Sequence, residues 1–251
     1  MAVGYLKSAA RALLNIVIPP RCGGCSVRIA AQPGLCADCF SGLRHISAPL
    51  CGRCGQPFAD GFGVCGAGCR MQGTLLTMGR SALVYDEASK ALILPFKRAG
   101  RTDLAPMLAL LLLQAGREVL QGADVLIPVP LHPLRLLRRR YNQSQLLAAA
   151  LAKLSGHRVM PWALKRRRYT PQQSGSHTAR RRNVRGAFSV RRDVRGLNVV
   201  LIDDVLTSGA TLEACAAALI NAGAARVSFL TVARTRAAVE ADDLASESFA
   251  A

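Results

Sequence analysis

The fold is decided by the stretch Val199-Val200-Leu201-Ile202-Asp203-Asp204-Val205-Leu206-Thr207-Ser208-Gly209-Ala210-Thr211. A continuous apolar run, two carboxylates and a hydroxyl-rich loop precede the Ala-rich residues 212–222. This order predicts a buried strand over 198–202, an acidic strand end, a loop and a helix. Backbone N–H groups at a helix N-terminus favour an anion, and the glycine lets the backbone come close to it. The loop therefore predicts a phosphate site.

The two carboxylates narrow the expected ligand. Adjacent acids at the mouth of a parallel sheet repel one another, which a structural role rarely requires. Together, Asp203 and Asp204 can accept hydrogen bonds from the vicinal hydroxyls of a ribose, so a sugar phosphate is implied. The alternative is a capped helix with both aspartates in a solvated turn. The ligand site is favoured because these features coincide at the edge where open α/β folds bind ligands.

This stretch resembles the phosphoribosyl-diphosphate (PRPP) signature of type I phosphoribosyltransferases, an apolar strand followed by two acids and a Thr-Thr-Gly-like loop. Ser208 stands where a second Thr is common. The resemblance implies that Asp203 and Asp204 hold the ribose hydroxyls. It also implies that the 5′-phosphate is held by Thr207, Ser208, Gly209, Ala210 and Thr211.

The length and net charge of the chain limit the classes of protein to which it can belong. A chain of 251 residues predicts one large domain with a small appended module. The formal charge of +18 falls to +14 if two zinc ions are each bound by four thiolates, so diphosphates or nucleic acid are expected partners. No apolar run reaches the roughly twenty residues of a membrane span, and residues 1–20 contain no convincing signal-peptide cleavage site. We expect a cytoplasmic protein.

Eight of the nine cysteines lie in four closely spaced pairs, which are typical of zinc knuckles. The equal gaps from Cys25 to Cys36 and from Cys54 to Cys65 predict the same ribbon twice. A cross-braced pairing is the alternative, and a disulfide framework would need an oxidising compartment. Since four thiolates leave no open coordination position, both zinc ions are expected to be structural. The expected sets are Cys22, Cys25, Cys36 and Cys39, and Cys51, Cys54, Cys65 and Cys69.

The chain divides into four expected parts: an amphipathic N-terminal helix within 1–20, a double zinc ribbon at 21–78, an α/β domain at 79–235 and a disordered tail at 236–251. Residues 165–188 are too polar for a core helix and are expected to form a flap over the site. Strands are expected at 80–85, 123–129, 198–202 and 227–232, with a further one near 159–164. Helices are expected at 88–96, 103–120, 144–154 and 212–222.

Basic residues follow two of these elements. A basic turn is expected after residue 96, and a group of arginines follows the proline-rich strand end Pro128-Val129-Pro130-Leu131-His132-Pro133. Guanidinium forks match phosphate oxygens, although a solvated basic face is the alternative for any one arginine. His132 is either a proton donor or a loop anchor. The candidate ligands of a diphosphate are Lys97, Arg98, Arg138, Arg139, Arg140 and the backbone of Val129, Pro130, Leu131 and His132.

A second resemblance rests on the order of the motifs along the chain. The cysteine pairs, the proline-rich strand end, Arg140-Tyr141-Asn142-Gln143, Gln172, residues 182–188 and the acidic loop together resemble the ComF family. Members of this family are competence-associated, phosphoribosyltransferase-like proteins with an N-terminal double zinc ribbon. The resemblance covers about residues 19–234 and implies a doubly wound parallel sheet and a role in DNA uptake or nucleotide metabolism. Relatives often have Gly where this chain has Arg140.

Two functional hypotheses follow. The first is a phosphoribosyltransferase that uses PRPP and Mg²⁺, with carboxylates below the sugar and cations around the leaving diphosphate. Its acceptor cannot be read from the sequence. The second is a non-catalytic protein that handles single-stranded DNA or senses PRPP beside other competence proteins, although aromatic stacking residues are few. A zinc-ribbon transcription factor would leave the sugar-phosphate loop unexplained.

Overall fold

The computed structural model of the chain describes residues 19–30, 34–58, 65, 69, 71, 73–167 and 186–235. Three expectations lie outside the described residues: the N-terminal helix, the centre of the flap at 168–185 and the tail at 236–251. Within the described ranges, no helix is long and apolar enough to cross a membrane.

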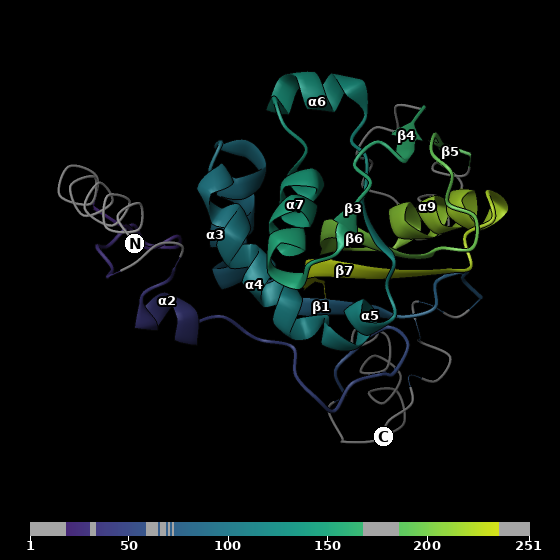
Figure 1. The fold of residues 1–251 in the computed structure, drawn as a ribbon. Helices are drawn as coiled ribbons and strands as arrows, with labels where there is room; N and C mark the ends of the chain where they lie inside the picture. Colours follow the sequence, from purple (N-terminus) through teal and green to yellow (C-terminus); the bar gives the residue numbers. More distant parts are fainter. Residues whose placement is uncertain are drawn as a thin grey trace, which may run out of the picture.

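A five-stranded sheet forms the centre of the fold, and all its neighbouring strands are parallel (Figure 1). The strand order is β1-β7-β6-β2-β3. Because parallel strands are covered on both faces, they are expected to be apolar throughout, and the four residues of β2 are all buried. The strands are β1 (Gly79–Val84), β2 (Val125–Pro128), β3 (Arg158–Val159), β6 (Asn198–Leu206) and β7 (Arg226–Arg234).

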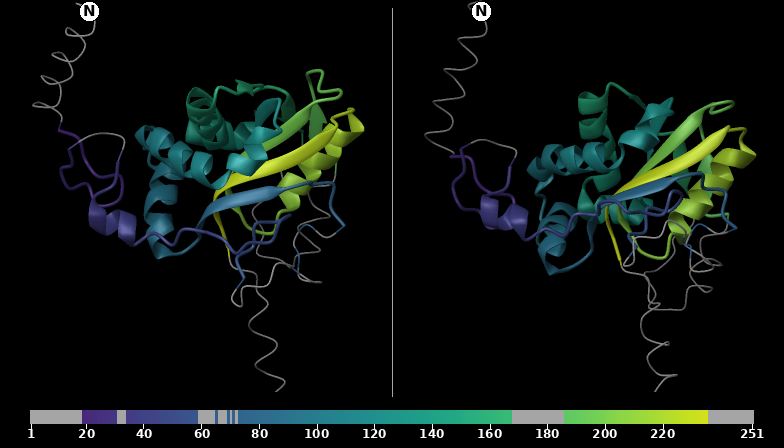
Figure 2. Two further views of the ribbon diagram at one scale, coloured as in Figure 1. Left: turned by 60° about the horizontal axis from the view of Figure 1, so that its bottom comes forward. Right: turned by 90° about the horizontal axis from the view of Figure 1, so that it is seen from below.

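Helices cover both faces of this sheet (Figure 2). On one face lie α3 (Glu87–Arg98), α4 (Ala105–Ala115) and α7 (Gln143–Ser155), and on the other lies α9 (Ala210–Asn221). Successive residues of a strand point to opposite faces, and β6 shows this directly. Its Val200 and Ile202 belong to the first core, whereas Val199 and Leu201 belong to the second. The predicted doubly wound parallel sheet is confirmed.

The expected single helix over 103–120 is wrong. The segment forms the 3₁₀-helix η1 (Thr102–Leu104), then α4, and after a break at Gly116 the short α5 (Arg117–Gln121). A Cβ atom on Gly116 would lie 2.6 Å from both Cδ atoms of Leu230, so the missing side chain lets the chain approach β7. The helix expected at 88–96 also runs further, to Arg98, so its last two basic residues are helical rather than part of a turn.

The single strand expected near 159–164 is also wrong. β3 ends at Val159, and β4 (Leu164–Arg166) instead pairs antiparallel with β5 (Phe188–Val190). Arg166 is buried in this hairpin, with its guanidinium 5.5 Å from the ring centre of Phe188. The two ends of the expected flap therefore belong to a small ordered sheet. The sequence also did not predict α2 (Ala37–Ser41) or α6 (Pro133–Arg139).

The two cysteine-pair segments repeat a local structure at two different places. An antiparallel bridge joins Arg21 to Arg28 around the first pair, and an equally spaced bridge joins Leu50 to Pro57 around the third. The first ribbon lies beside α3 and is continued by α2, whereas the segment that follows runs to the β1 side of the sheet (Figures 1 and 2). The expected repeat is therefore visible in the backbone.

Candidate functional site

The two acids lie inside a strand and not beyond its end. We expected the strand to stop at residue 202, but β6 continues to Leu206 because β7 stays paired with it. Asp203 is in register with Thr231, and Leu206 is in register with Arg234. Both carboxylates therefore belong to residues on a paired strand, within four positions of the loop that leads into α9.

Asp204 is a buried charge with only half of its carboxylate satisfied. The residue is 4% exposed, and its Oδ1 atom lies 3.0 Å from Nζ of Lys97 at the end of α3. Its Oδ2 atom is buried and finds no hydrogen-bond donor among the residues that the structure describes. A buried carboxylate oxygen without a donor is costly, which is typical of a site that a ligand completes.

Asp203 is held from two sides. Its Oδ1 atom accepts hydrogen bonds from Oγ of Ser144 at 2.9 Å and from the backbone N–H of Asp204 at 2.9 Å. Burial of the carboxyl group, reinforced by the adjacent charge of Asp204, raises the pKa of Asp203 to about 7. The carboxyl group of Asp203 therefore gains or loses its proton near neutral pH.

The loop between β6 and α9 has the geometry expected of an anion site. Gly209 adopts the left-handed conformation, with φ of 78°, and directly precedes the first helical residue. Thr207 is exposed, while Ser208 and Thr211 are half-buried. Ala210 is buried, and its backbone N–H makes a long hydrogen bond of 3.5 Å to Oγ of Ser208.

The proline-rich strand end serves partly as an anchor. The N–H of Val129 donates to the carbonyl of Ile202 at 3.0 Å, and the carbonyl of Val129 accepts from Nδ2 of Asn142 at 3.1 Å. Both backbone groups of Val129 are therefore engaged, and Pro130 has no N–H. His132 caps α6, with its Nδ1 atom accepting from the N–H of Leu134 at 3.3 Å. Of the predicted backbone donors, that of Leu131 remains a candidate.

A cavity of about 930 Å³ collects the predicted arginines, and we call it the arginine cavity. Because α6 was not predicted, neither was the way it gathers these side chains with the end of α3. Arg139 is close enough to Asp204 for the two charges to interact, although burial lowers the pKa of Arg139 overall. Five guanidinium groups around one cavity repel one another, which favours a bound anion. They belong to Arg98, Arg135, Arg138, Arg139 and Arg140.

Arg140 occupies a backbone position that favours glycine. Its φ is 64°, in the left-handed region, where it ends α6. A glycine would adopt this conformation without the steric cost that a side chain carries there. The following residue connects α6 to α3, because the hydroxyl of Tyr141 donates to the carbonyl of Phe96 beside Lys97.

Sequence reasoning missed Ser144. Its only signal in the sequence was its place two residues after Asn142, which caps α7.

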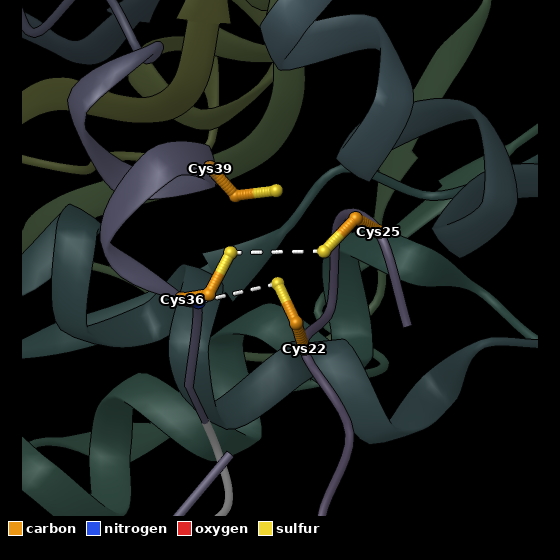
Figure 3. A group of neighbouring side chains, drawn as sticks. All are labelled: Cys22, Cys25, Cys36 and Cys39. Atoms are coloured by element: carbon orange, nitrogen blue, oxygen red, sulfur yellow. Dashed lines mark hydrogen bonds between the residues drawn. The ribbon is translucent and has the colours of Figure 1, made fainter. Parts of the chain in front are cut away.

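The eight paired cysteines form two compact groups in chain order, not in the cross-braced arrangement. Within each group the ligand atoms lie within 4.8 Å of one another, and Figure 3 shows the first four thiols turned toward a common centre. The sulfurs of Cys25 and Cys36 are 3.6 Å apart, and those of Cys54 and Cys65 are 3.7 Å apart. Tetrahedral zinc with Zn–S bonds of about 2.3 Å places sulfurs about 3.8 Å apart, so both groups fit structural zinc.

The second cysteine group is joined to the sheet by two buried arginines. Arg234 of β7 donates to the carbonyl of Cys54 at 2.7 Å and to Oε1 of Gln56 at 2.6 Å. Arg80 of β1 donates to the carbonyl of Gly52 at 3.1 Å. These charge-assisted hydrogen bonds fix the second cysteine group to β7, the neighbour of β6, and to β1 at the edge of the sheet.

Comparison with known proteins identifies both parts of the chain. A double zinc ribbon domain matches residues 13–70, and a phosphoribosyl transferase domain matches residues 144–249. The DNA utilization protein YhgH of Salmonella typhimurium is 34% identical over 88% of this chain and 99% of its own length. Competence protein F of Haemophilus influenzae is 32% identical over 81% of this chain and 92% of its own. Competence protein ComFC of Bacillus subtilis is 30% identical over 80% and 84%, respectively.

Proposed function

The chain belongs to the ComF family of phosphoribosyltransferase-like proteins with an N-terminal double zinc ribbon, and from this premise we propose that it binds PRPP with Mg²⁺ and transfers the phosphoribosyl group to an acceptor. Its relatives are named for competence and DNA utilization. We place this activity in the cytoplasm, in the handling of DNA or of the nucleotides derived from it.

The half-satisfied carboxylate of Asp204 is the observation that carries the proposal. Its Oδ1 atom is paired with Lys97, while the buried Oδ2 atom lacks a donor among the described residues. A ribose hydroxyl would supply the donor that this oxygen lacks. Asp203 lies beside it, and the N-terminus of α9 offers the phosphate site one loop away.

Two groups of residues can stabilise the two charges that develop during the proposed reaction. As the bond from C1 to diphosphate breaks, positive charge develops on the ribose and negative charge on the leaving group. Asp203 and Asp204 lie where they can stabilise the first charge, and Arg98, Arg138 and Arg139 can neutralise the second. When bound with the substrate, Mg²⁺ would further neutralise the diphosphate, while the loop after β6 orients the 5′-phosphate.

Changing both acids to Asn tests this proposal. Asp203→Asn with Asp204→Asn keeps the size of the side chains and removes their charge. PRPP binding, measured calorimetrically with Mg²⁺, should weaken by about 1–3 kcal/mol, and diphosphate release should stop. Asp193→Asn is the matched control, since Asp193 is exposed and pairs only locally with Arg195 at 2.8 Å. A double variant that binds PRPP like the parent would overturn the assignment.

The size of the arginine cavity favours a second candidate function, the handling of single-stranded DNA without turnover. Five guanidinium groups exceed the charge that one diphosphate brings, and about 930 Å³ is room for more than that group. Binding through arginine–phosphate contacts releases counterions, so affinity for an oligothymidylate should fall steeply with salt and depend little on sequence. A flat salt response would remove this candidate.

A further inference from the structure

A second cavity is lined by Asn142, the residue that caps α7, and by Pro130 and Leu131 at the strand end after β2. It measures about 550 Å³, and we call it the tryptophan cavity. Its walls come from the strand end after β2, the start of α7, the turn before β4 and the segment after β5. Asn142 lines it, and Ser144, two residues on, donates to Asp203. The cavity therefore opens next to the position proposed for the ribose.

Trp162 forms one wall of this cavity and is 61% exposed. It is the single tryptophan of the chain. A large indole left in water loses favourable burial, and an exposed aromatic face beside a cavity is suited to stacking on a planar ring. Apolar contacts on other walls come from Leu131, Leu136 and Leu164, so a ring can be enclosed on more than one side.

The charged lining of the cavity has one sign. Lys165 and Arg166 come from β4, and Arg191 and Arg192 follow β5. None of the described side chains that line the cavity is acidic. Asn142 and Gln145 add amide groups that can hydrogen-bond the edge of a heterocycle. This combination matches a ligand with a flat face and a negative substituent.

We propose that the tryptophan cavity binds the acceptor, and that the acceptor is a nitrogen heterocycle carrying an acidic group, stacked on Trp162 with that group toward Arg191 and Arg192. The inference rests on the proposed phosphoribosyl transfer. In that reaction a ring nitrogen donates its lone pair to C1 while the bond from C1 to oxygen breaks. Diphosphate leaves with the bonding electrons, and the proton of the ring nitrogen, where it carries one, passes to solvent.

The single tryptophan gives a direct test on the zinc-loaded full chain. Two probe pairs differ in their carboxylate: orotate against uracil, and nicotinate against nicotinamide. We expect the acidic member of at least one pair to quench the tryptophan fluorescence at a concentration at least tenfold lower than its neutral partner. Calorimetry should give the same order. Equal binding of both members, or quenching by an oligothymidylate alone, would overturn the proposal.

Variants separate stacking from charge. Trp162→Phe should keep probe binding in the calorimeter, and Trp162→Leu should weaken it at least tenfold. Arg192→Gln should remove most of the preference for the acidic probe. Arg195→Gln is the matched control, because Arg195 is exposed, pairs with Asp193 and does not line the cavity. Unchanged probe binding in Trp162→Leu and Arg192→Gln would place the probe elsewhere and refute the inference.

The experiments distinguish a failure of this inference from a failure of the proposed function. PRPP binding is measured on the same preparations with Mg²⁺. If PRPP binds and no acidic probe does, the acceptor assignment fails and the phosphoribosyl site stands. If an acidic probe binds and PRPP does not, the proposed transfer fails, and with it the role of the probe site as an acceptor site.

Discussion

The two cysteine groups share their spacing and internal geometry but differ in what surrounds them. In the first, Cys22 is buried, Cys25 is exposed and Cys36 and Cys39 are half-buried, and none of the four belongs to either core cluster of the described residues. In the second, Cys51 and Cys54 are buried and belong to the core beneath α9, while Cys65 and Cys69 are half-buried and pack against it. The same local motif is therefore an appendage in one place and part of the main domain in the other.

The contacts of each ribbon explain this difference. The first meets the domain through Leu35, which packs against the core, and through Gly23, where a Cβ atom would lie 2.6 Å from Cδ2 of Leu104. The second lies under the loop that follows β6. A void of about 10 Å³ separates Cys54 and Leu76 on one side from Leu206 and Gly209 on the other. The second zinc site therefore supports the backbone that carries the proposed phosphate loop.

The strongest test of this difference is to change equivalent cysteines of the two ribbons. Cys22 and Cys51 occupy the same position in the repeat. Cys22→Ser and Cys51→Ser should each remove one of two zinc ions, as measured by elemental analysis. Losing a structural zinc site forfeits on the order of 10 kcal/mol of binding free energy. For Cys51→Ser this loss should lower the melting temperature of the whole domain and weaken PRPP binding. For Cys22→Ser, PRPP binding should remain nearly intact.

Equal effects of the two cysteine variants on PRPP binding would show that the difference in burial has no functional consequence. A parent protein with one zinc or none under metal-replete conditions would contradict the premise itself.

A second variant tests the same link without touching a zinc ligand. Arg234→Met removes a buried guanidinium that holds Cys54 and Gln56 and lies in register with Leu206. We expect a loss of about 2–3 kcal/mol in the free energy of unfolding, the scale of losing hydrogen bonds to a charged group. Chemical denaturation measures this loss, and both zinc ions should stay bound.

The control for that variant lies in the first ribbon. Arg21 donates to the carbonyl of Ser26 at 3.0 Å but is exposed, so Arg21→Met should change the unfolding free energy by about 0.5 kcal/mol or less. A similar cost for both arginines would mean that the second ribbon is no more firmly attached than the first.

The sequence predicted elements whose signals are local. The apolar run before Asp203, the glycine at 209 and the cysteine spacing each act over a few residues, so the sheet, the loop and the ribbons could be foreseen. It did not predict the break at Gly116, which depends on Leu230 across the sheet. It also missed the contact from Ser144 to Asp203, which joins residues 59 positions apart. The embedding of the second ribbon was missed for the same reason.

The pH dependence of the unfolding free energy tests the environment of Asp203 in β6, the strand that leads into the loop above the second ribbon. The pKa of Asp203 is raised to about 7, above that of an unfolded aspartate at about 3.9. Between these values the native state keeps a proton that the unfolded state releases. The contribution of Asp203 to stability should therefore fall as pH rises from about 4 to about 7 and then level off.

Asp203→Asn isolates this contribution. The difference in unfolding free energy between the variant and the parent should shift in favour of the variant across that pH range, because the variant avoids the buried charge. Taking the difference at each pH cancels the effect of acid on the zinc thiolates, which both proteins share. A difference that does not change with pH would contradict the raised pKa.

The smallest expected effect concerns Arg80, which makes one exposed ion pair and several less exposed hydrogen bonds to backbone carbonyls. Arg80 pairs with Glu118 at 2.6 Å, yet the Glu118 side chain is 65% exposed, so water already screens this interaction. Arg80 is itself buried and keeps its hydrogen bonds to the carbonyls of Gly52 and Gly79 when Glu118 is changed. Glu118→Gln should therefore cost less than about 1 kcal/mol, and the cost should shrink further in high salt. Arg80→Met should cost more, since it removes a donor to the carbonyls of Cys51, Gly52 and Gly79, and its hydrogen bonds to Cys51 and Gly79 are buried. If denaturation instead gives Glu118→Gln the larger cost, the ion pair and not the guanidinium–carbonyl contacts holds the second ribbon to the sheet.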